Sequence, residues 1–220
     1  MQAIIDVLIN VLAYFYSWTG NYGLSLILLT LLIKLVTWPL TQKQLESTKK
    51  MQALEPERKK LQERFKNDKE KMNQALMELW KENKVNPAAG CVPLLIQFPV
   101  LIGMFQMLRD PVRIAAAIPN FSPLFLGINM TLDVKDLPIV IAAVAVILTG
   151  GTTFLQQYLT MGSSGDKNTK MMLYIMPLML AYFSYTFPAG LVLYWALNSV
   201  LSVAHHFIIP SAQKGALEKK

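Results

Sequence analysis

One lysine of this chain lies inside a run of apolar residues that is long enough to cross a membrane. The run is Leu24–Leu40, and Lys34 is the one charged residue in it. A lysine at the centre of a membrane helix costs about 3 kcal/mol on insertion scales, so a chain that keeps one normally gives it water or a polar partner. The chemistry that Lys34 offers is that of a buried cation, which attracts carboxylates and other anions.

The depth of Lys34 in the run allows two interpretations. A strongly basic segment follows Leu40, which therefore marks the cytoplasmic end. With a rise of about 1.5 Å per residue, Lys34 lies about 9 Å inside that end. Either its side chain extends along the helix surface to the lipid headgroups, or it faces a water-filled cavity inside a helix bundle.

Polar residues around Lys34 favour the cavity. Thr30, Lys34, Thr37 and Thr41 follow the spacing i, i+4, i+7, i+11, which places them on one face of a helix. A side chain that only reaches for the headgroups needs no such polar face above and below it.

Two later apolar segments carry similar polar faces, each towards its cytoplasmic half. That of segment 137–158 consists of Thr149, Thr152, Thr153, Gln156 and Gln157. That of segment 188–208 consists of Trp195, Asn198, Ser199, Ser202 and His206. If the faces converge, they form a hydrophilic groove that is open to the cytoplasm and closed by apolar packing on the other side. We expect the groove to be lined by Lys34, Thr30, Thr37, Gln97, Thr153, Gln156, Gln157, Trp195, Asn198 and Ser202.

Several classes of chemistry are excluded by the residues that are missing. No Asp or Glu lies within any predicted span, which argues against a proton or cation pathway built on a carboxylate. The sequence has no P-loop, GxSxG or HExxH motif. His205 and His206 point about 100° apart on a helix, and Cys91 is the single cysteine. We therefore expect no catalytic residue, no metal and no cofactor, and the protein is not predicted to be an enzyme.

The elements that hold these faces are predicted to be helices. The chain has 220 residues, 53% of them hydrophobic, with five runs near the length of about 20 residues that a span needs. We predict an all-α membrane protein with five transmembrane helices, a cytoplasmic helical hairpin and an N-terminal interfacial helix. The predicted segments are an interfacial helix 1–22, spans at 23–40, 87–108, 137–158, 171–187 and 188–208, the hairpin 41–86, an outer loop 109–136, a cytoplasmic loop 159–170 and a cytoplasmic tail 209–220.

The charge distribution predicts the orientation. The net charge is +7, and segment 41–91 holds twelve Lys and Arg residues, whereas residues 1–22 hold none. Because cytoplasmic loops carry the excess of Lys and Arg, we expect the N-terminus outside and the C-terminus inside. The hairpin, with its turn at Lys66–Asp68, is either a solvated charged arm with one buried seam or a docking arm for cytoplasmic partners.

Four stretches of the sequence point to one known family. They are IKLVTWPLTQKQ, MQALEPERKKLQERF, VNPAAGCVPLLIQFPV and FPAGLVLYWALNS. Together they resemble the YidC/Oxa/Alb family of membrane protein insertases, and the resemblance covers the chain from its first span to its fifth. It implies five core spans in the bacterial cell membrane and a cytoplasm-facing groove without a channel. It also implies Sec-independent insertion of small membrane proteins and assistance to the Sec translocon.

The resemblance also implies roles for single residues. Lys34 matches the basic residue of the groove, which is usually arginine, and Thr30, Gln157 and Trp195 match groove-lining positions. Lysine keeps the charge but lacks the bidentate fork of arginine. We expect a short form of the family that lacks the large periplasmic domain, and the tail after Pro210 is short and weakly basic.

We predict an insertase and chaperone whose partners are nascent membrane proteins with short translocated tails. The lipid bilayer, the ribosome and the Sec translocon are further expected partners, the last two through the hairpin, and no sequence-specific nucleic acid is expected. A small channel or transporter for an anionic solute, with Lys34 as the anion site, is the alternative. A scaffold for assembly without insertion is a third possibility.

Overall fold

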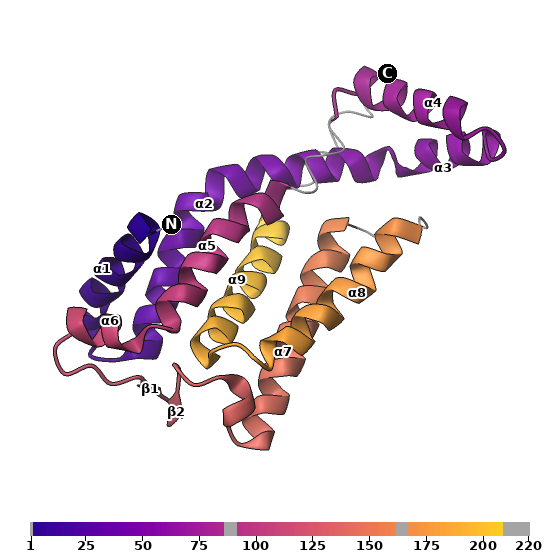
Figure 1. Cartoon of the computed structure of the whole chain (residues 1–220). Helices are drawn as coiled ribbons and strands as arrows, with labels where there is room; N and C mark the ends of the chain where they lie inside the picture. Colours follow the sequence, from indigo (N-terminus) through magenta and orange to yellow (C-terminus); the bar gives the residue numbers. More distant parts are fainter. Residues whose placement is uncertain (1, 86–91, 162–166, 209–220) are drawn as a thin grey trace.

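A computed structural model describes residues 2–85, 92–161 and 167–208 of the chain (Figure 1). The regular structure in these ranges is almost entirely helical. The predicted start of the second span at residue 87, the middle of the loop 159–170 and the tail 209–220 lie outside the described residues.

Three of the described helices are long and apolar enough to cross a membrane. They are Tyr22–Ala53, Ile139–Thr160 and Ala189–Ile208. Two further stretches in the described ranges, Gln97–Leu108 and Met171–Ser184, are apolar but shorter. The all-α membrane architecture is thereby confirmed, whereas the number of five spans stays a prediction.

The first two helices form an antiparallel pair. Helix α1 (Gln2–Thr19) buries the side that carries Ile5, Leu8 and Leu12, and this side packs against α2 and α5. A turn at Gly20 follows, and the side chain of Asn21 caps α2 (Tyr22–Ala53) by accepting the amide of Leu24 at 3.1 Å. Helix α2 continues through Pro39, so its 32 residues span about 48 Å, well beyond the hydrocarbon core of a bilayer.

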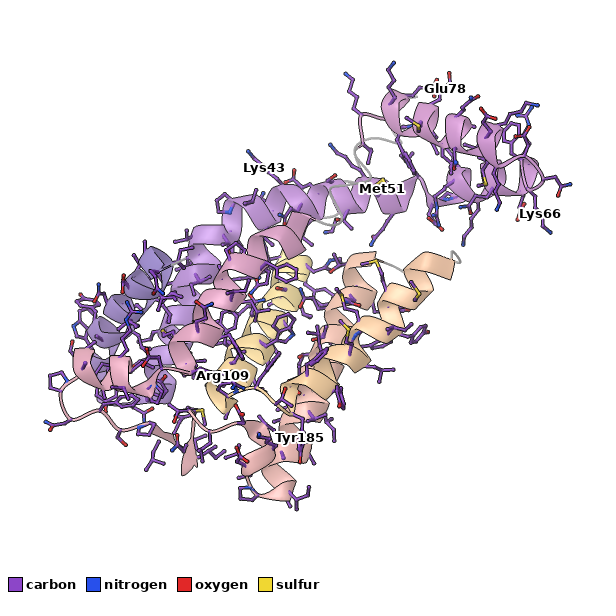
Figure 2. All side chains as sticks on the ribbon, viewed as in Figure 1. Lys43, Met51, Lys66, Glu78, Arg109 and Tyr185 are labelled. Carbon is purple, nitrogen blue, oxygen red and sulfur yellow. The ribbon has the colours of Figure 1, made fainter. Side chains whose placement is uncertain are left out.

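The far end of α2 leads into a helical hairpin. Helix α3 (Glu55–Arg64) begins with Pro56 in its first turn, where its missing amide hydrogen is tolerated. Helix α4 (Lys69–Glu82) returns along α3 and buries Leu76 and Leu79. Figure 2 shows Lys66 and Glu78 on this arm, whereas Arg109 and Tyr185 lie near the opposite end of the molecule.

The outer loop forms a cap. It follows α5 (Val92–Leu108) and contains α6 (Pro111–Ala117), the two-stranded hairpin β1 (Leu124–Phe125) and β2 (Ile128–Asn129), and a 3-10 turn over Val134–Asp136. The strands are antiparallel, with Phe125 opposite Ile128. An ion pair between Arg113 of α6 and Asp6 ties this cap to α1.

The last three helices pack side by side (Figure 1). Helices α7 (Ile139–Met161) and α8 (Lys167–Ser184) approach closely at Gly150, where a Cβ atom would lie 3.1 Å from that of Ala181. Helix α9 (Ala189–Ile208) packs against α7 on one side and α2 on the other. Helices α7 and α8 extend into the predicted loop 159–170 from both ends. Between Gly151 and Gly162 the sequence has no glycine or proline that would end α7.

The hydrophobic core lies in the half of the bundle next to the cap. Many of its fully buried side chains come from the first turns of α2 and α9 and the last turns of α5, among them Tyr22, Leu26, Met104, Met107, Leu108, Leu191 and Tyr194; α1, α6 and the 3-10 turn add Leu12, Ile114 and Val134. Four backbone hydrogen bonds join the cap to the α8–α9 turn. Among them, the amide of Gly190 donates to the carbonyl oxygen of Met130 at 2.8 Å, and that of Ala189 donates to Leu132 at 2.8 Å. These bonds fix where α9 begins.

Substitution of Gly190 is expected to destabilise the bundle. A Cβ atom at this position would lie 3.0 Å from Cδ1 of Leu26 and 3.1 Å from the carbonyl oxygen of Met130. Overpacking of this kind typically costs about 1–3 kcal/mol. Gly190→Ala should therefore lower the melting temperature of the purified protein in detergent. Gly151→Ala is the matched control, because nothing lies within 4 Å of a Cβ atom there. Equal melting of the two variants would contradict the packing described at Gly190.

The start of α4 is expected to loosen at low pH. Asp68 accepts the amide of Lys71 at 3.0 Å, and this hydrogen bond, together with the Lys71 side chain, lowers the pKa of the Asp68 carboxyl group. A lowered pKa means that the cap stabilises the folded hairpin above the ordinary pKa of aspartate and is lost as the pH falls through the lowered value. Asp68→Ala should therefore speed amide hydrogen exchange in the first turn of α4 at neutral pH. Asp68→Asn keeps a capping oxygen but lacks the charge, so it should exchange faster than wild type and more slowly than the alanine variant. If the alanine variant exchanges like wild type, the cap does not stabilise the turn.

Candidate functional site

Helix α9 joins the polar faces of the other helices. It packs against α2, α5 and α7 (Figure 1). A side-chain hydrogen bond links it to each of them. The site is therefore described outward from α9, beginning with its contact to the buried lysine.

Lys34 points from α2 into the bundle and meets α9. Its side chain is 7% exposed. The Nζ atom donates to Oγ of Ser202 at 2.7 Å and lies 3.5 Å from Oδ1 of Asn198. Ser202 in turn donates to the carbonyl oxygen of Asn198 at 2.7 Å. The structure thus brings together three of the predicted groove residues. Lys34 does not extend along the helix surface towards the headgroups.

The charge of Lys34 is met by neutral oxygens. None of the ion pairs in the described part of the chain involves this residue. Removing an ammonium group from water costs several kcal/mol, which neutral dipoles only partly offset. An ammonium group has three donors, and two of them point at Ser202 and Asn198. Lys34 can therefore still attract a carboxylate, and a pair at 4 Å is worth about 4 kcal/mol at an effective dielectric constant of 20, before desolvation.

A second contact joins α9 to α7. Nε1 of Trp195 donates to Oγ1 of Thr153 at 2.8 Å, and Thr153 is buried. Trp195 lies one turn from Asn198 on the same helix, so the Trp195–Thr153 pair continues the polar face of α9 beyond the Lys34 contact. The predicted convergence of the α7 and α9 faces is therefore seen at this pair of residues.

A third contact joins α9 to α5 through a residue that sequence reasoning missed. Nε2 of Gln97 donates to the hydroxyl group of Tyr194 at 2.6 Å. Tyr194 is buried, and a buried tyrosine usually finds a hydrogen-bond partner for its hydroxyl group. Gln97 is the lone polar side chain deep in the second span. The need of a buried tyrosine for a partner could therefore have pointed to a bond between Tyr194 and Gln97.

Among the described residues, four other predicted ones form no hydrogen bond with the side chains of Lys34, Asn198 or Ser202, although the hydroxyl group of Thr37 lies 3.2 Å from the backbone carbonyl oxygen of Lys34. Gln157 donates to Sδ of Met176 in α8 at 2.9 Å, so it faces a different neighbour. Thr30 and Thr37 donate to carbonyl oxygens of their own helix, at 2.7 Å to Leu26 and 2.9 Å to Ile33. Gln156 is half-buried, and its backbone carbonyl accepts from Thr160.

A ring stack borders the Lys34 cluster (Lys34, Asn198 and Ser202), towards the C-terminal end of α9. Trp38, one turn after Lys34 on α2, stacks on His205 of α9 with ring centroids 3.7 Å apart and planes tilted by 24°. His205 is fully buried, whereas His206 is half-buried. His205 thus lies inside the bundle beside Trp38, and the placement of His206 on the polar face of α9 stays a prediction.

Comparison with known proteins identifies the family. The sequence profile of the family described as 60Kd inner membrane protein matches residues 14–216. A Syntrophobacter fumaroxidans protein named membrane protein insertase YidC is 41% identical over 207 residues, which cover 91% of this chain and 36% of the relative. A protein of the same name from Geobacter sp. (strain M21) is 41% identical over 202 residues, which cover 92% of this chain and 36% of the relative.

The fold also matches a solved structure. The structure entitled "Active YidC insertase crystal structure with the first transmembrane domain resolved" superposes with a TM-score of 0.72 at 24% sequence identity. The match covers 94% of this chain and 46% of that one. This chain spans little more than a third of the length of the two named relatives. The profile match over most of the chain confirms the predicted resemblance, and the chain belongs to the 60Kd inner membrane protein family, whose relatives carry the name membrane protein insertase YidC.

Proposed function

We propose that this chain inserts small membrane proteins into a bacterial inner membrane. The names of its relatives support this activity. One observation connects the proposal to particular residues. Lys34 is buried, its Nζ atom lies 2.7 Å from Oγ of Ser202, and it has no carboxylate partner among the described residues. A cation that lacks its own counter-ion is suited to bind the acidic residues of a guest peptide.

In this proposal the chain has five spans, with the N-terminus outside and the C-terminus inside. The polar residues between α2, α5, α7 and α9 form a groove that opens to the cytoplasm. The apolar core between α2, α5 and α9 supports closure on the outer side, because its buried side chains lie next to the cap. Such a groove shortens the distance that a polar tail must travel through apolar surroundings, but it does not conduct ions.

The insertion step follows from the placement of the charge. A short polar tail enters from the cytoplasm, and its acidic residues are attracted to Lys34. Attraction of up to about 4 kcal/mol, before desolvation, offsets part of the cost of bringing the tail into the membrane. The apolar segment of the guest then slides out past α7 and α9 and enters the lipid.

The hairpin α3–α4 is proposed to receive cytoplasmic partners. It lies at the end of α2 away from the cap (Figure 1), and its surface is densely charged. This placement supports contact with the ribosome and with the Sec translocon while a guest is being delivered to the groove.

The role of the charge is tested by substitution of Lys34. The protein is reconstituted alone into liposomes, and insertion of a single-span protein with an acidic outer tail is measured by protease protection. Lys34→Arg should retain insertion, because the charge is kept. Lys34→Ala should reduce it by about tenfold, which corresponds to a loss of about 1.4 kcal/mol in tail binding.

A guest with its acidic residues changed to amides serves as the control and should respond little to either variant. If all three proteins insert the acidic guest equally, Lys34 has no part in guest binding. If none of them inserts any guest, yet ions cross the liposomes, the anion channel is the better account.

A further inference from the structure

The tip of the β1–β2 hairpin holds a leucine in a backbone conformation that leucine rarely adopts. Leu126 and Gly127 join the two strands with φ values of +51° and +79°. Positive φ at both central residues is typical of the tight hairpin turn that normally has Asn or Gly at its first position. A bulky side chain at positive φ is a steric outlier, and 84% of Leu126 is exposed. Neither backbone preference nor packing explains a leucine here.

The hairpin is held where α2 begins. The ring of Phe125 occupies the space in front of Gly23, in the first turn of α2. Phe121 packs edge-to-face on Tyr22 with ring centroids 5.0 Å apart. The amide of Met130 donates to the carbonyl oxygen of Pro123 at 2.9 Å and closes the base of the hairpin. The tip therefore projects at the level where the first apolar helix enters the membrane.

The hairpin is continuous with an aromatic surface on α1. The hydroxyl group of Tyr16 accepts the amide of Ser122 at 3.1 Å, which joins the loop to the last turns of α1. On those turns Trp18 and Tyr14 are exposed and pack against each other. Exposed tryptophan and tyrosine side chains are enriched where a membrane meets water. The contacts of the loop thus place Leu126 along the same boundary as Trp18.

We propose that Leu126 inserts into the headgroup region of the bilayer and anchors the outer loop to the lipid surface. Burial of its side chain among lipid offsets the unfavourable backbone conformation, whereas exposure to water would add to it. The same loop fixes the start of α9 through the bonds from Gly190 to Met130 and from Ala189 to Leu132. A lipid anchor on this loop would therefore steady the helix that meets Lys34. This inference is independent of guest insertion.

The proposal is tested by measuring the depth of a fluorescent probe. Cys91, the single cysteine of the chain, is first changed to alanine. An environment-sensitive NBD label is then attached to Leu126→Cys, and the protein is reconstituted into liposomes. Lys135→Cys, in the same outer segment, is the control for water, and Ile147→Cys, on the exposed side of α7, is the control for lipid. The Leu126 probe should emit at shorter wavelength than the Lys135 probe and be quenched by lipids that carry a shallow nitroxide.

Each other result would overturn the proposal. Quenching of the Leu126 probe by aqueous iodide to the level of the Lys135 probe would place it in water. Protection from both iodide and nitroxide lipids would mean that a protein surface covers it, such as a second copy of this chain.

A second variant separates anchoring from folding. Asparagine tolerates positive φ, so Leu126→Asn should melt in detergent at or above the temperature of the wild type. A clearly lower melting temperature would mean that Leu126 is kept for the fold and not for the lipid.

Discussion

The burial of one ammonium group among neutral oxygens is the constraint on which the rest of this structure depends. Lys34 has Ser202 and Asn198 as its partners, and both belong to α9. A small rotation or shift of α9 would remove them and leave a buried cation without any polar contact, which is among the most costly changes a protein interior can suffer. The position of α9 must therefore be fixed by interactions that do not involve the charge.

Those interactions lie at the other end of the bundle. The cap of the outer loop holds the first residues of α9 by backbone hydrogen bonds, and Gly190 allows Leu26 and Met130 to approach closely. Buried side chains of α2, α5 and α9 complete the core there. The apolar half thus supplies the rigidity, and the half that contains Lys34 keeps polar groups that a core would not tolerate. In the proposed function, this division closes the groove on one side and leaves it accessible on the other.

Helical spacing placed Lys34 on the polar face of one helix and Asn198 and Ser202 on that of another, and the structure shows that these two faces meet. Spacing could not identify which helix each glutamine would face. Gln157 contacts Met176 of α8, although its position in the α7 pattern is as regular as that of Thr153. Nor could spacing predict that His205 would be buried and His206 only half-buried. The Trp38–His205 stack and the Gln97–Tyr194 bond depend on the packing distance between helices, which periodicity does not contain.

The account rests on attraction between the charge of Lys34 and an opposite charge on the guest, and reversal of both charges tests this most directly. Lys34→Glu is reconstituted into liposomes and offered two guests that differ only in tail charge, one acidic and one basic. Relative to wild type, the variant should lose insertion of the acidic tail and gain insertion of the basic tail. Equal loss of both guests by a folded variant, or equal insertion of both, would contradict a role for charge in this site.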